Sequence, residues 1–294
     1  MSAASAGTLP RRPYGKTGVE LSIIGFGGIV VMNAEPEHAA RVVAESVERG
    51  VNYFDVAPSY GDAEIKLGPA LEPYRKDVFL ACKTGRRDAE GAREEFERSL
   101  ERLRTDYFDL YQLHAITDVA KDVDAVFAKG GAWEFISQAH KEGRIRYLGF
   151  SAHSIEAALA AMDRYDFDSV LFPVNFANVF AGNFGPQIME AAEKKGVARL
   201  ALKGLARQRW PEGDPDREKF KKCWYQPLSD PREASLGLRY TLSQPITAAI
   251  PPGEEVLYRM ALDIAQDFTP ITAAEVEELK ALAAELTPIF QATT

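Results

Sequence analysis

The sequence predicts an α/β protein of one domain, in which eight parallel strands alternate with helices and close into a (β/α)8 TIM barrel. Two observations predict this fold. Eight short segments are continuously apolar rather than alternating, as strands covered on both faces are. A segment of helical period follows each of them, and this alternation favours parallel strands with right-handed crossovers. Eight such units close a barrel, and 294 residues are enough for one.

The predicted strands cover residues 22–28, 51–56, 78–83, 108–114, 145–151, 169–175, 197–203 and 246–250. The predicted helices cover residues 36–49, 62–72, 91–104, 132–142, 155–164, 184–195, 231–243 and 254–266. Gly50, Gly143 and Gly196 stand directly after three of these helices, where a left-handed residue commonly ends a helix. Ser154 is a candidate cap of a fourth helix. An open, doubly wound sheet is the competing fold, but the G-x-G-x-x-G turn that it uses is absent.

Two segments fall outside these units. Residues 204–230 are too long for a plain connection between a strand and a helix, so we expect a functional loop there. Residues 272–286 predict an extra C-terminal helix, with Thr272 and Glu275 at the spacing of a capping box. We expect this helix to pack on the barrel wall.

The composition argues against several classes of function. A net charge of −8 is unlike that of a nucleic-acid-binding protein, which needs a basic surface. Two cysteines are too few for a disulfide framework, and no apolar run reaches the roughly 18 residues that span a membrane. Residues 1–9 lack the apolar core of a secretory signal and predict a frayed tail before the barrel domain of residues 10–294. We therefore expect a cytoplasmic protein of unknown oligomeric state.

Polar side chains end six consecutive predicted strands, the second to the seventh. They are Asp55, Lys83, His114, Ser151, Asn175 and Lys203. Tyr60 follows Asp55 by five residues, within the second connection. Because barrels carry their catalytic groups at the C-terminal ends of the strands, we expect these side chains to share one rim. Lys83 needs a paired charge if it is buried, and Asp55 is its natural partner. Each residue alone also has a structural explanation, but their joint position favours a site.

A tyrosine, a lysine, an aspartate and a histidine on one rim have a specific use. The phenol of Tyr60, with an ordinary pKa near 10, is a poor proton donor at neutral pH, and the ammonium of Lys83 is expected to lower that pKa. Asp55 keeps the ammonium charged, and His114 orients a carbonyl oxygen. This set protonates an oxyanion as it forms, which carbonyl reduction requires, and the hydride must then come from a cofactor.

The chain resembles the aldo-keto reductases. The resemblance rests on RRPYGKTGVELSIIGFGG, VNYFDVAPSYGDAE, LACKTG, FDLYQLH and EGRIRYLGFSAH, and it covers residues 10 to 255. It implies the (β/α)8 barrel with an N-terminal hairpin. It also implies that Tyr60 is the general acid–base, that Asp55 and Lys83 tune it, and that His114 assists. Cys82, next to Lys83, is expected to pack in the barrel wall.

The resemblance further implies a nicotinamide dinucleotide, NAD(P)(H), bound without a Rossmann domain. Ser151 matches the serine that binds the carboxamide, whereas Asn175 stands where glutamine is common and Leu202 where an aromatic ring often stacks. Lys203, Arg207 and Arg209 are expected to clamp the pyrophosphate, unless they form a solvated basic loop. The remaining residues expected at the cofactor are Leu205, Gly253, Glu254, Glu255 and Arg259.

The segment IPPGEEVLYRMALD departs from the family pattern after the eighth strand. Pro252 and Gly253 replace the Lys and Ser that many members place around the adenosine 2′-phosphate. Glu254 and Glu255 bring two carboxylates close to that position, where they repel a phosphate but accept from a ribose hydroxyl. The sequence therefore favours NAD(H), although both glutamates also suit the first turn of a helix.

The substrate is expected to be a small-molecule carbonyl, alcohol or sugar. The candidate contacts are His153, Trp210, Trp224 and Tyr225, since aromatic rings over a small polar site suit sugars or aromatic carbonyls. The tryptophans serve equally well as anchors of their loop.

Three other functions are weighed against a reductase. A metal-dependent hydrolase needs clustered ligands, and only His114 and His153 are suitably placed, without an H-x-H pair, so no metal is expected. A non-catalytic, cofactor-binding regulatory barrel stays open. So does a sugar dehydrogenase or epimerase that holds NAD tightly and recycles it in place.

Overall fold

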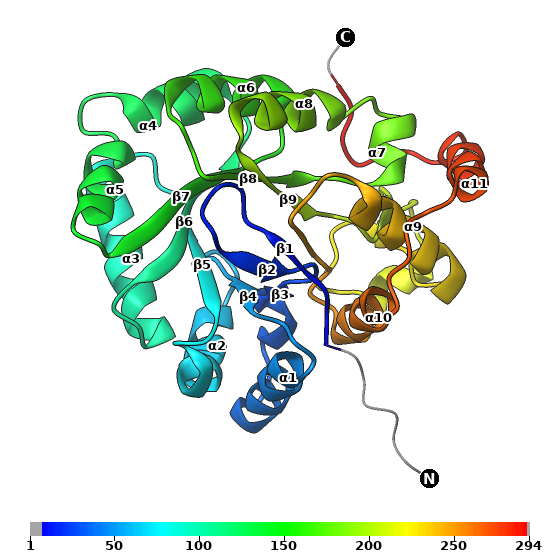
Figure 1. The fold of residues 1–294 in the computed structure, drawn as a ribbon, viewed down its shortest axis with the longest axis horizontal. Coiled ribbons are helices and arrows are strands. Elements are labelled where there is room, and N and C mark those ends of the chain that lie inside the picture. Colours follow the sequence, from blue (N-terminus) through cyan, green and yellow to red (C-terminus); the bar gives the residue numbers. More distant parts are fainter. Residues whose placement is uncertain (1–7, 293–294) are drawn as a thin grey trace.

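The computed structural model describes residues 8–292, and within them eight parallel strands form the predicted barrel (Figure 1). They are β3 (Phe26–Gly27), β4 (Tyr53–Asp55), β5 (Phe79–Thr84), β6 (Phe108–Ile116), β7 (Ile145–Ala152), β8 (Ser169–Pro173), β9 (Ala198–Leu202) and β12 (Ala248–Ile250). Each pairs with the next in chain order, from β3 to β9 and on to β12. The ring closes where Ile24 bridges Ala249 in parallel, and the amide of Gly25 donates to the Ala249 carbonyl at 2.9 Å.

Helices surround the strands and match the predicted helices to within two residues at each end (Figure 1). They are α1 (Pro36–Glu48), α2 (Ala63–Leu71), α3 (Ala89–Leu103), α5 (Ala132–Lys141), α6 (Ile155–Arg164), α8 (Pro186–Lys195), α9 (Pro231–Ser243) and α10 (Glu255–Gln266). Gly50, Gly143 and Gly196 have φ of 95°, 78° and 70°, which confirms the predicted helix ends. The hydroxyl of Ser154 accepts from the amide of Ala157 at 3.2 Å and caps α6 as predicted.

Short elements complete the chain. They are β1 (Arg11–Pro13), β2 (Glu20–Ser22), the 3-10 helices η1 (Gly28–Val31), η2 (Glu72–Tyr74) and η4 (Pro215–Glu218), the π-helix η3 (Val119–Asp124), α4 (Ala125–Phe127), α7 (Phe176–Phe180), β10 (Ala206–Gln208), β11 (Gln226–Pro227) and α11 (Ala273–Ala283). The predicted strand over 22–28 is therefore wrong in its extent, because its first residue belongs to β2 and only 26–27 lie in β3.

The first and the last elements outside the eight units pack on the barrel or on its helices. The helix α11 contacts α7 and α9, and Thr272 and Glu275 form the predicted capping box, which confirms a C-terminal helix on the barrel wall. Residues 1–7 of the predicted tail over 1–9 lie outside the described residues. At its end Leu9 is buried, and its amide donates to the Arg49 carbonyl at 3.1 Å.

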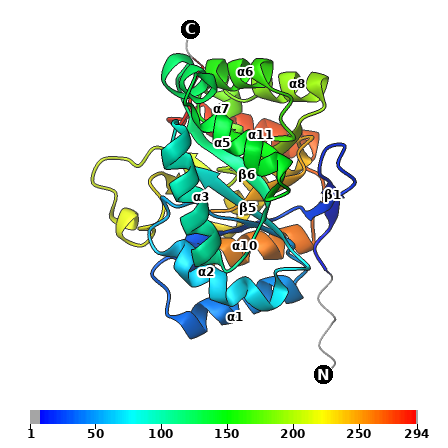
Figure 2. The ribbon, with the colours of Figure 1, turned by 90° about the vertical axis from the view of Figure 1, so that its left-hand side faces the viewer.

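The hairpin of β1 and β2 covers one end of the barrel, as the resemblance implied (Figures 1 and 2). Tyr14 lies between its strands, packs edge-on against Phe79 and donates through its hydroxyl to Ser169 at 2.8 Å. Phe79 and Ser169 are the first residues of β5 and β8, so the hairpin closes the N-terminal end. Any opening to the barrel interior therefore lies at the C-terminal end.

Side chains two residues apart on a strand share the barrel interior, because the side-chain period of a strand is two. At the closed end the interior layer is apolar and contains Tyr53, Ala81 and Leu110. Two residues further along the same strands the layer is polar, with Asp55, Lys83 and Gln112, all buried. The outward-facing Cys82 belongs to the apolar layer between strands and helices, as predicted. The change from apolar to polar inside the barrel marks the candidate site.

Candidate active site

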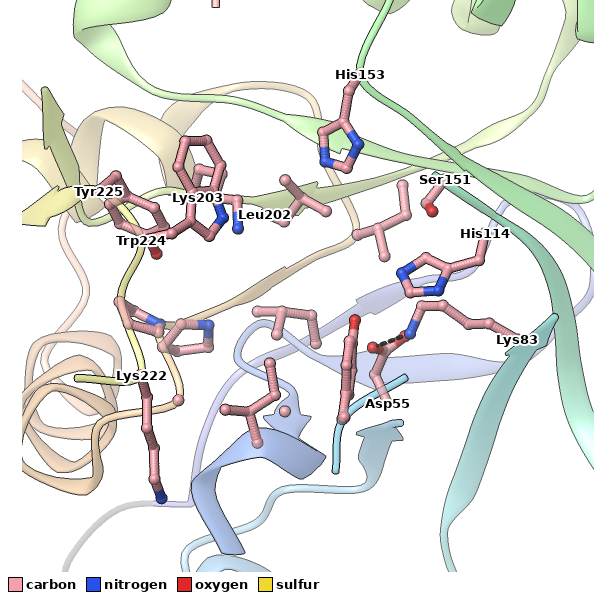
Figure 3. Close-up of a pocket in the computed structure, with 18 of the residues that line it drawn as sticks. Asp55, Lys83, His114, Ser151, His153, Leu202, Lys203, Lys222, Trp224 and Tyr225 are labelled. Carbon is pink, nitrogen blue, oxygen red and sulfur yellow. Dashed lines mark hydrogen bonds and ion pairs between the residues drawn. The ribbon is translucent and has the colours of Figure 1, made fainter. Parts of the chain in front are cut away.

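A pocket of about 490 Å³ opens at the C-terminal end of the barrel (Figure 3). Eleven of the predicted site residues line it: Asp55, Tyr60, Lys83, His114, Ser151, His153, Leu202, Lys203, Trp224, Tyr225 and Gly253. The rest of its lining is Gly27, Ile29, Thr117, Leu171, Lys222, Ile250, Pro251, Pro252 and Phe290. Residues from distant parts of the sequence thus meet on one rim, as the strand ends predicted.

Asp55 and Lys83 form the ion pair that the sequence predicted, and their side chains are only 3% and 1% exposed. The ammonium of Lys83 also donates to the Val56 carbonyl at 3.2 Å. Asp55 accepts from the Tyr53 hydroxyl and from Gln112, each at 3.3 Å. Burial opposes the charged form of Lys83, but Asp55 outweighs it and raises the pKa of Lys83. The ammonium therefore stays charged inside the barrel.

Tyr60 lies beside this pair and beside His114. The Lys83 nitrogen is 5.3 Å from the centre of the Tyr60 ring, and the His114 ring meets that ring edge-on at 5.7 Å. Burial raises the pKa of Tyr60, whereas the charge of Lys83 lowers it without cancelling the effect of burial. The expectation that Lys83 brings this pKa below 10 is therefore wrong for the protein alone, because burial dominates. The phenol keeps its proton at neutral pH.

The two histidines of the pocket are neutral at neutral pH. Burial, followed by the charge of Lys83, lowers the pKa of His114 to about 3. Burial, followed by the charge of Lys203, lowers the pKa of His153 to about 4. His153 stacks on Phe290, with ring centres 5.1 Å apart and an interplanar angle of 14°. Both imidazoles can therefore hydrogen-bond a polar ligand group without adding charge.

A backbone irregularity at the end of β6 orients His114 and Ser151. The pairing of β6 with β7 shifts register between Leu113 and Ile116, and Ala115 between them has φ of 55°. The amide of Ala115 donates to the Ser151 hydroxyl at 2.7 Å. That hydroxyl still has a proton to donate. Left-handed non-glycine residues are uncommon and recur at functional sites, which agrees with this position.

Lys203 occupies the wall opposite Asp55 and Lys83 (Figure 3). Its ammonium lies over the rings of Tyr225 and Trp224, at 4.8 and 5.2 Å from their centres. Burial lowers the pKa of Lys203 to about 8. Trp224 remains 54% exposed, and it forms the outer part of this wall.

Several predicted residues do not line the pocket, because other groups in the structure engage them. Arg207 pairs with Glu233, Arg209 donates to the Pro288 carbonyl, and Trp210 donates to the Cys223 carbonyl at 3.0 Å. The Trp210 contact agrees with the anchoring role that the sequence left open. Leu205 is buried in the apolar core.

The predicted residues at the start of α10 are engaged as well. Glu254 accepts from the backbone amide of Lys222 at 2.6 Å. Glu255 pairs with His38 and with Arg259, and Arg259 also pairs with Glu45. Burial of Glu255 is outweighed by its bonds to His38 and Arg259, which lower its pKa.

Asn175 caps α7 through its carbonyl oxygen, which accepts from the amide of Asn178 at 2.8 Å. Its side chain is fully buried, and its Nδ2 has no partner among residues 8–292. Asn175 was predicted at the cofactor, but it does not line the pocket, because its side chain is buried against the start of α7.

Sequence reasoning missed three polar or aromatic lining residues, which are Thr117, Lys222 and Phe290. Lys222 lies in the long segment that the sequence marked as functional, but it was not among the residues chosen there, which were Leu205, Arg207, Arg209, Trp210, Trp224 and Tyr225. Phe290 follows α11 and reaches the rim from beyond the barrel. No local pattern distinguishes it from an ordinary apolar residue near a chain end.

Comparison with known proteins agrees with the fold. The aldo/keto reductase family model matches residues 23–284. The oxidoreductase YqkF of Bacillus subtilis is 26% identical, over 92% of this chain and 95% of its own. L-galactose dehydrogenase of Arabidopsis thaliana is 30% identical, over 52% of this chain and 51% of its own. The holo form of aldo-keto reductase AKR11C1 from Bacillus halodurans superposes with a TM-score of 0.73 at 24% identity, covering 95% of this chain and 98% of its own.

The chain belongs to the aldo/keto reductase family, which confirms the resemblance predicted from its motifs. It is therefore an oxidoreductase, with the barrel fold of that family. Within residues 8–292, no helix has the length and hydropathy needed to cross a bilayer, and no group of three or more His, Cys, Asp or Glu gathers as metal ligands do.

Proposed function

We propose that this protein transfers a hydride between a nicotinamide dinucleotide and a carbonyl or alcohol substrate, with Tyr60 as the general acid–base. The observation that carries the proposal is the set of groups around one phenol. The ammonium of Lys83, held by Asp55, lies 5.3 Å from the Tyr60 ring, and the neutral His114 lies 5.7 Å from it. Aldo/keto reductases use nicotinamide cofactors, which agrees with this chemistry.

The residues present fit such a cofactor. The Ser151 hydroxyl lines the pocket and has a proton to donate, so it suits the carboxamide of a nicotinamide. Leu202, Ile250 and Pro251 give the pocket an apolar wall for a flat ring. When bound, the dinucleotide supplies or accepts the hydride.

The protein's own part in the reaction is the transfer of a proton. His114 hydrogen-bonds the carbonyl oxygen of the substrate and places it next to Tyr60. The phenol of Tyr60, which burial keeps protonated, donates its proton as negative charge develops on that oxygen. Lys83 then stabilises the phenolate, and Asp55 keeps Lys83 charged and in position. In the direction of alcohol oxidation, the phenolate accepts the proton.

Replacing Tyr60 tests this role. Tyr60→Phe removes the proton donor but keeps the ring, so turnover should fall by roughly 100- to 10,000-fold. Binding of the dinucleotide, measured by quenching of tryptophan fluorescence, should be retained. Tyr240→Phe is a suitable control, since this buried tyrosine on α9 does not line the pocket. Unchanged turnover in Tyr60→Phe would contradict the mechanism. Cofactor binding without turnover in the unmodified protein would favour a non-catalytic cofactor-binding barrel.

We also propose a preference for NAD(H) over NADP(H). Glu254 and Glu255 stand at the start of α10, where carboxylates disfavour a 2′-phosphate. Arg259, the cation of the same turn, is already paired with Glu45 and Glu255. Parallel fluorescence titrations with NADH and NADPH should show tighter binding of NADH. Much tighter binding of NADPH would refute the preference.

The proposed substrates include sugars. Three relatives carry sugar-related names: L-galactose dehydrogenase, the D-arabinose 1-dehydrogenase of Saccharomyces cerevisiae and the 6-dehydroglucose reductase of Novosphingobium aromaticivorans. The exposed ring of Trp224 at the pocket edge suits the apolar face of a sugar. The site also suits other small aldehydes, ketones and alcohols.

The cytoplasmic location of the protein stays a prediction from its sequence.

A further inference from the structure

The peptide between His114 and Ala115 is held by side chains from two other parts of the barrel rim. The carbonyl oxygen of His114 accepts from Nη2 of Arg87 at 2.8 Å, and the amide of Ala115 donates to the Ser151 hydroxyl at 2.7 Å. This peptide lies where the pairing of β6 with β7 shifts register, and Ala115 has the left-handed φ of 55°. Because this conformation is disfavoured for a residue with a side chain, the backbone here needs partners that hold it.

Arg87 reaches this peptide from a backbone that is itself anchored. It lies in the connection between β5 and α3, four residues after Lys83. Its carbonyl accepts from the amide of Ala132 at 2.8 Å, and the amide of Ala89 donates to the Gly130 carbonyl at 2.9 Å. Both bonds tie the connection to the start of α5. The side chain of Arg87 is mostly buried and extends from this fixed base to the end of β6.

Asp122, in η3, orients the guanidinium of Arg87. Its Oδ1 accepts from Nε of Arg87 at 3.0 Å. Its Oδ2 accepts from the amides of Thr117 and Asp118 at 2.7 and 2.9 Å, and from the Thr117 hydroxyl at 3.0 Å. Burial is outweighed by these hydrogen bonds, which lower the pKa of Asp122, so the carboxylate stays charged. The Arg87–Asp122 pair therefore holds the backbone from His114 to Asp118.

An ion pair between two connections has a simpler explanation, which is that it only stabilises the barrel. The bond to His114 indicates a more specific role, because the guanidinium contacts the carbonyl of this residue itself. Burial, with the charge of Arg87 adding to it, also lowers the pKa of His114. Arg87 therefore acts on both properties that His114 needs, the place of its ring and its neutral state.

We propose that Arg87 is a positioning residue for His114. It holds the peptide that follows His114 and so keeps the imidazole edge-on to the Tyr60 ring, with 5.7 Å between the ring centres. Arg87 is not among the residues that line the pocket, so it acts through His114 rather than on the substrate. This role rests on the proposed function, in which His114 places the substrate oxygen, but the position of the ring is measurable without turnover.

The first test follows His114 by NMR in protein with carbon-13-labelled histidine, since the chain has only four histidines. The unmodified protein should show a nuclear Overhauser contact between His114 and Tyr60. In Arg87→Met this contact should weaken, and the pKa of His114 should rise from about 3 toward 6.5. Arg86→Met is the matched control, because that neighbouring side chain is exposed and pairs with Glu95. An unchanged contact in Arg87→Met would overturn the proposal.

A second variant decides the question if Arg87→Met does not fold. Arg87→Lys keeps the positive charge, but one ammonium cannot donate in two directions as the planar guanidinium does. The contact between His114 and Tyr60 should therefore weaken, while the pKa of His114 stays low. A full contact in Arg87→Lys would show that the charge alone is sufficient, and it would contradict the positioning by two directed hydrogen bonds.

Turnover shows whether this position matters for the reaction. With NADH and 4-nitrobenzaldehyde as the probe, Arg87→Met should lower kcat by roughly 10- to 100-fold, because a small displacement of a substrate-positioning group costs about that much. Binding of NADH should change far less, since Ser151 lies on β7 and keeps its place. In a His114→Ala background, Arg87→Met should lower kcat no further. Equal falls in both backgrounds would show that Arg87 acts elsewhere, and they would overturn the proposal.

The positioning by Arg87 and the proposed function fail in different ways. A weakened contact in Arg87→Met with unchanged turnover would support the hold on His114 but contradict the role of His114 in the proposed function. Absence of turnover in the unmodified protein would contradict the proposed function, and the contact measured by NMR would still decide the role of Arg87.

Discussion

Lys83 and Lys203 give the same signal in the sequence, because each stands at the end of a predicted barrel strand. Their environments differ by one carboxylate. Asp55 outweighs burial at Lys83 and raises its pKa, whereas burial dominates at Lys203 and lowers its pKa to about 8. The first lysine therefore serves as a fixed positive charge beside Tyr60. The ammonium of the second lysine lies over the rings of Tyr225 and Trp224 instead.

The two pocket histidines also make the folded protein sensitive to acid. Their pKa values of about 3 for His114 and about 4 for His153 lie below the ordinary value of 6.5. The unfolded chain therefore binds more protons than the folded one between these values and pH 6.5, so the free energy of unfolding decreases as pH falls through this window. Above pH 6.5 this contribution is fully present.

Replacement of either histidine should reduce that acid sensitivity. Between pH 7.5 and pH 5, each histidine accounts for about 2 kcal/mol of lost unfolding free energy. Between these two pH values, the unfolding free energy of His114→Gln and of His153→Gln should therefore fall by about 2 kcal/mol less than that of the unmodified protein. Urea unfolding at the two pH values measures the difference. Equal losses in all three proteins would show that these imidazoles titrate normally in the folded state.

At the scale of elements, the segment between β9 and α9 decides the shape of the pocket mouth. This segment lies at the opposite end of the barrel from the β1–β2 hairpin (Figure 2). Two hydrogen bonds of Lys222 hold it down: its amide donates to Glu254 at 2.6 Å, and its ammonium donates to Val30 at 2.9 Å. The first bond links the segment to the start of α10, and the second links it to η1.

Removing the Glu254 carboxylate should loosen this segment. Loss of one hydrogen bond to a charged group is worth about 1.5–3 kcal/mol, so amide exchange over residues 219–226 in Glu254→Ala should rise by roughly 10- to 100-fold. Hydrogen exchange followed by mass spectrometry measures it. Glu255→Ala is the matched control, because that carboxylate joins α10 to His38 and Arg259 instead. Equal amide exchange over residues 219–226 in both variants would show that the hydrogen bond from Lys222 to Glu254 does not hold the segment in place.

At the scale of the whole molecule, barrel closure places the site. Eight strands that run in one direction bring their C-terminal ends to one rim, and the bridge of Ile24 to Ala249 closes the ring. The hairpin fills the other end through Tyr14. The interior is thereby apolar at one end and polar at the other. A single pocket is then lined by residues as far apart in the chain as Gly27 and Phe290.

Much of this arrangement was predictable from local patterns. The continuous apolar strands, the helix period and the terminal glycines located nearly every element, and the strand ends located Asp55, Lys83 and His114. The extent of the first strand was not predictable, because residues 22–28 divide between the hairpin and the barrel and both parts are apolar. The position of Lys222 on the pocket lining was not predicted, because a lysine in a long polar segment looks in the sequence like an ordinary solvent-exposed lysine.

The sequence by itself determined the barrel and the order of Asp55, Tyr60, Lys83 and His114 along it. Both follow from local hydropathy and from the common direction of parallel strands. Only the tertiary structure decided which of the predicted basic side chains are paired with a carboxylate. Arg207 and Arg259 are neutralised by Glu233 and by Glu45, whereas Lys203 is left with aromatic neighbours. Such pairings join residues far apart in the chain, and no local pattern encodes them.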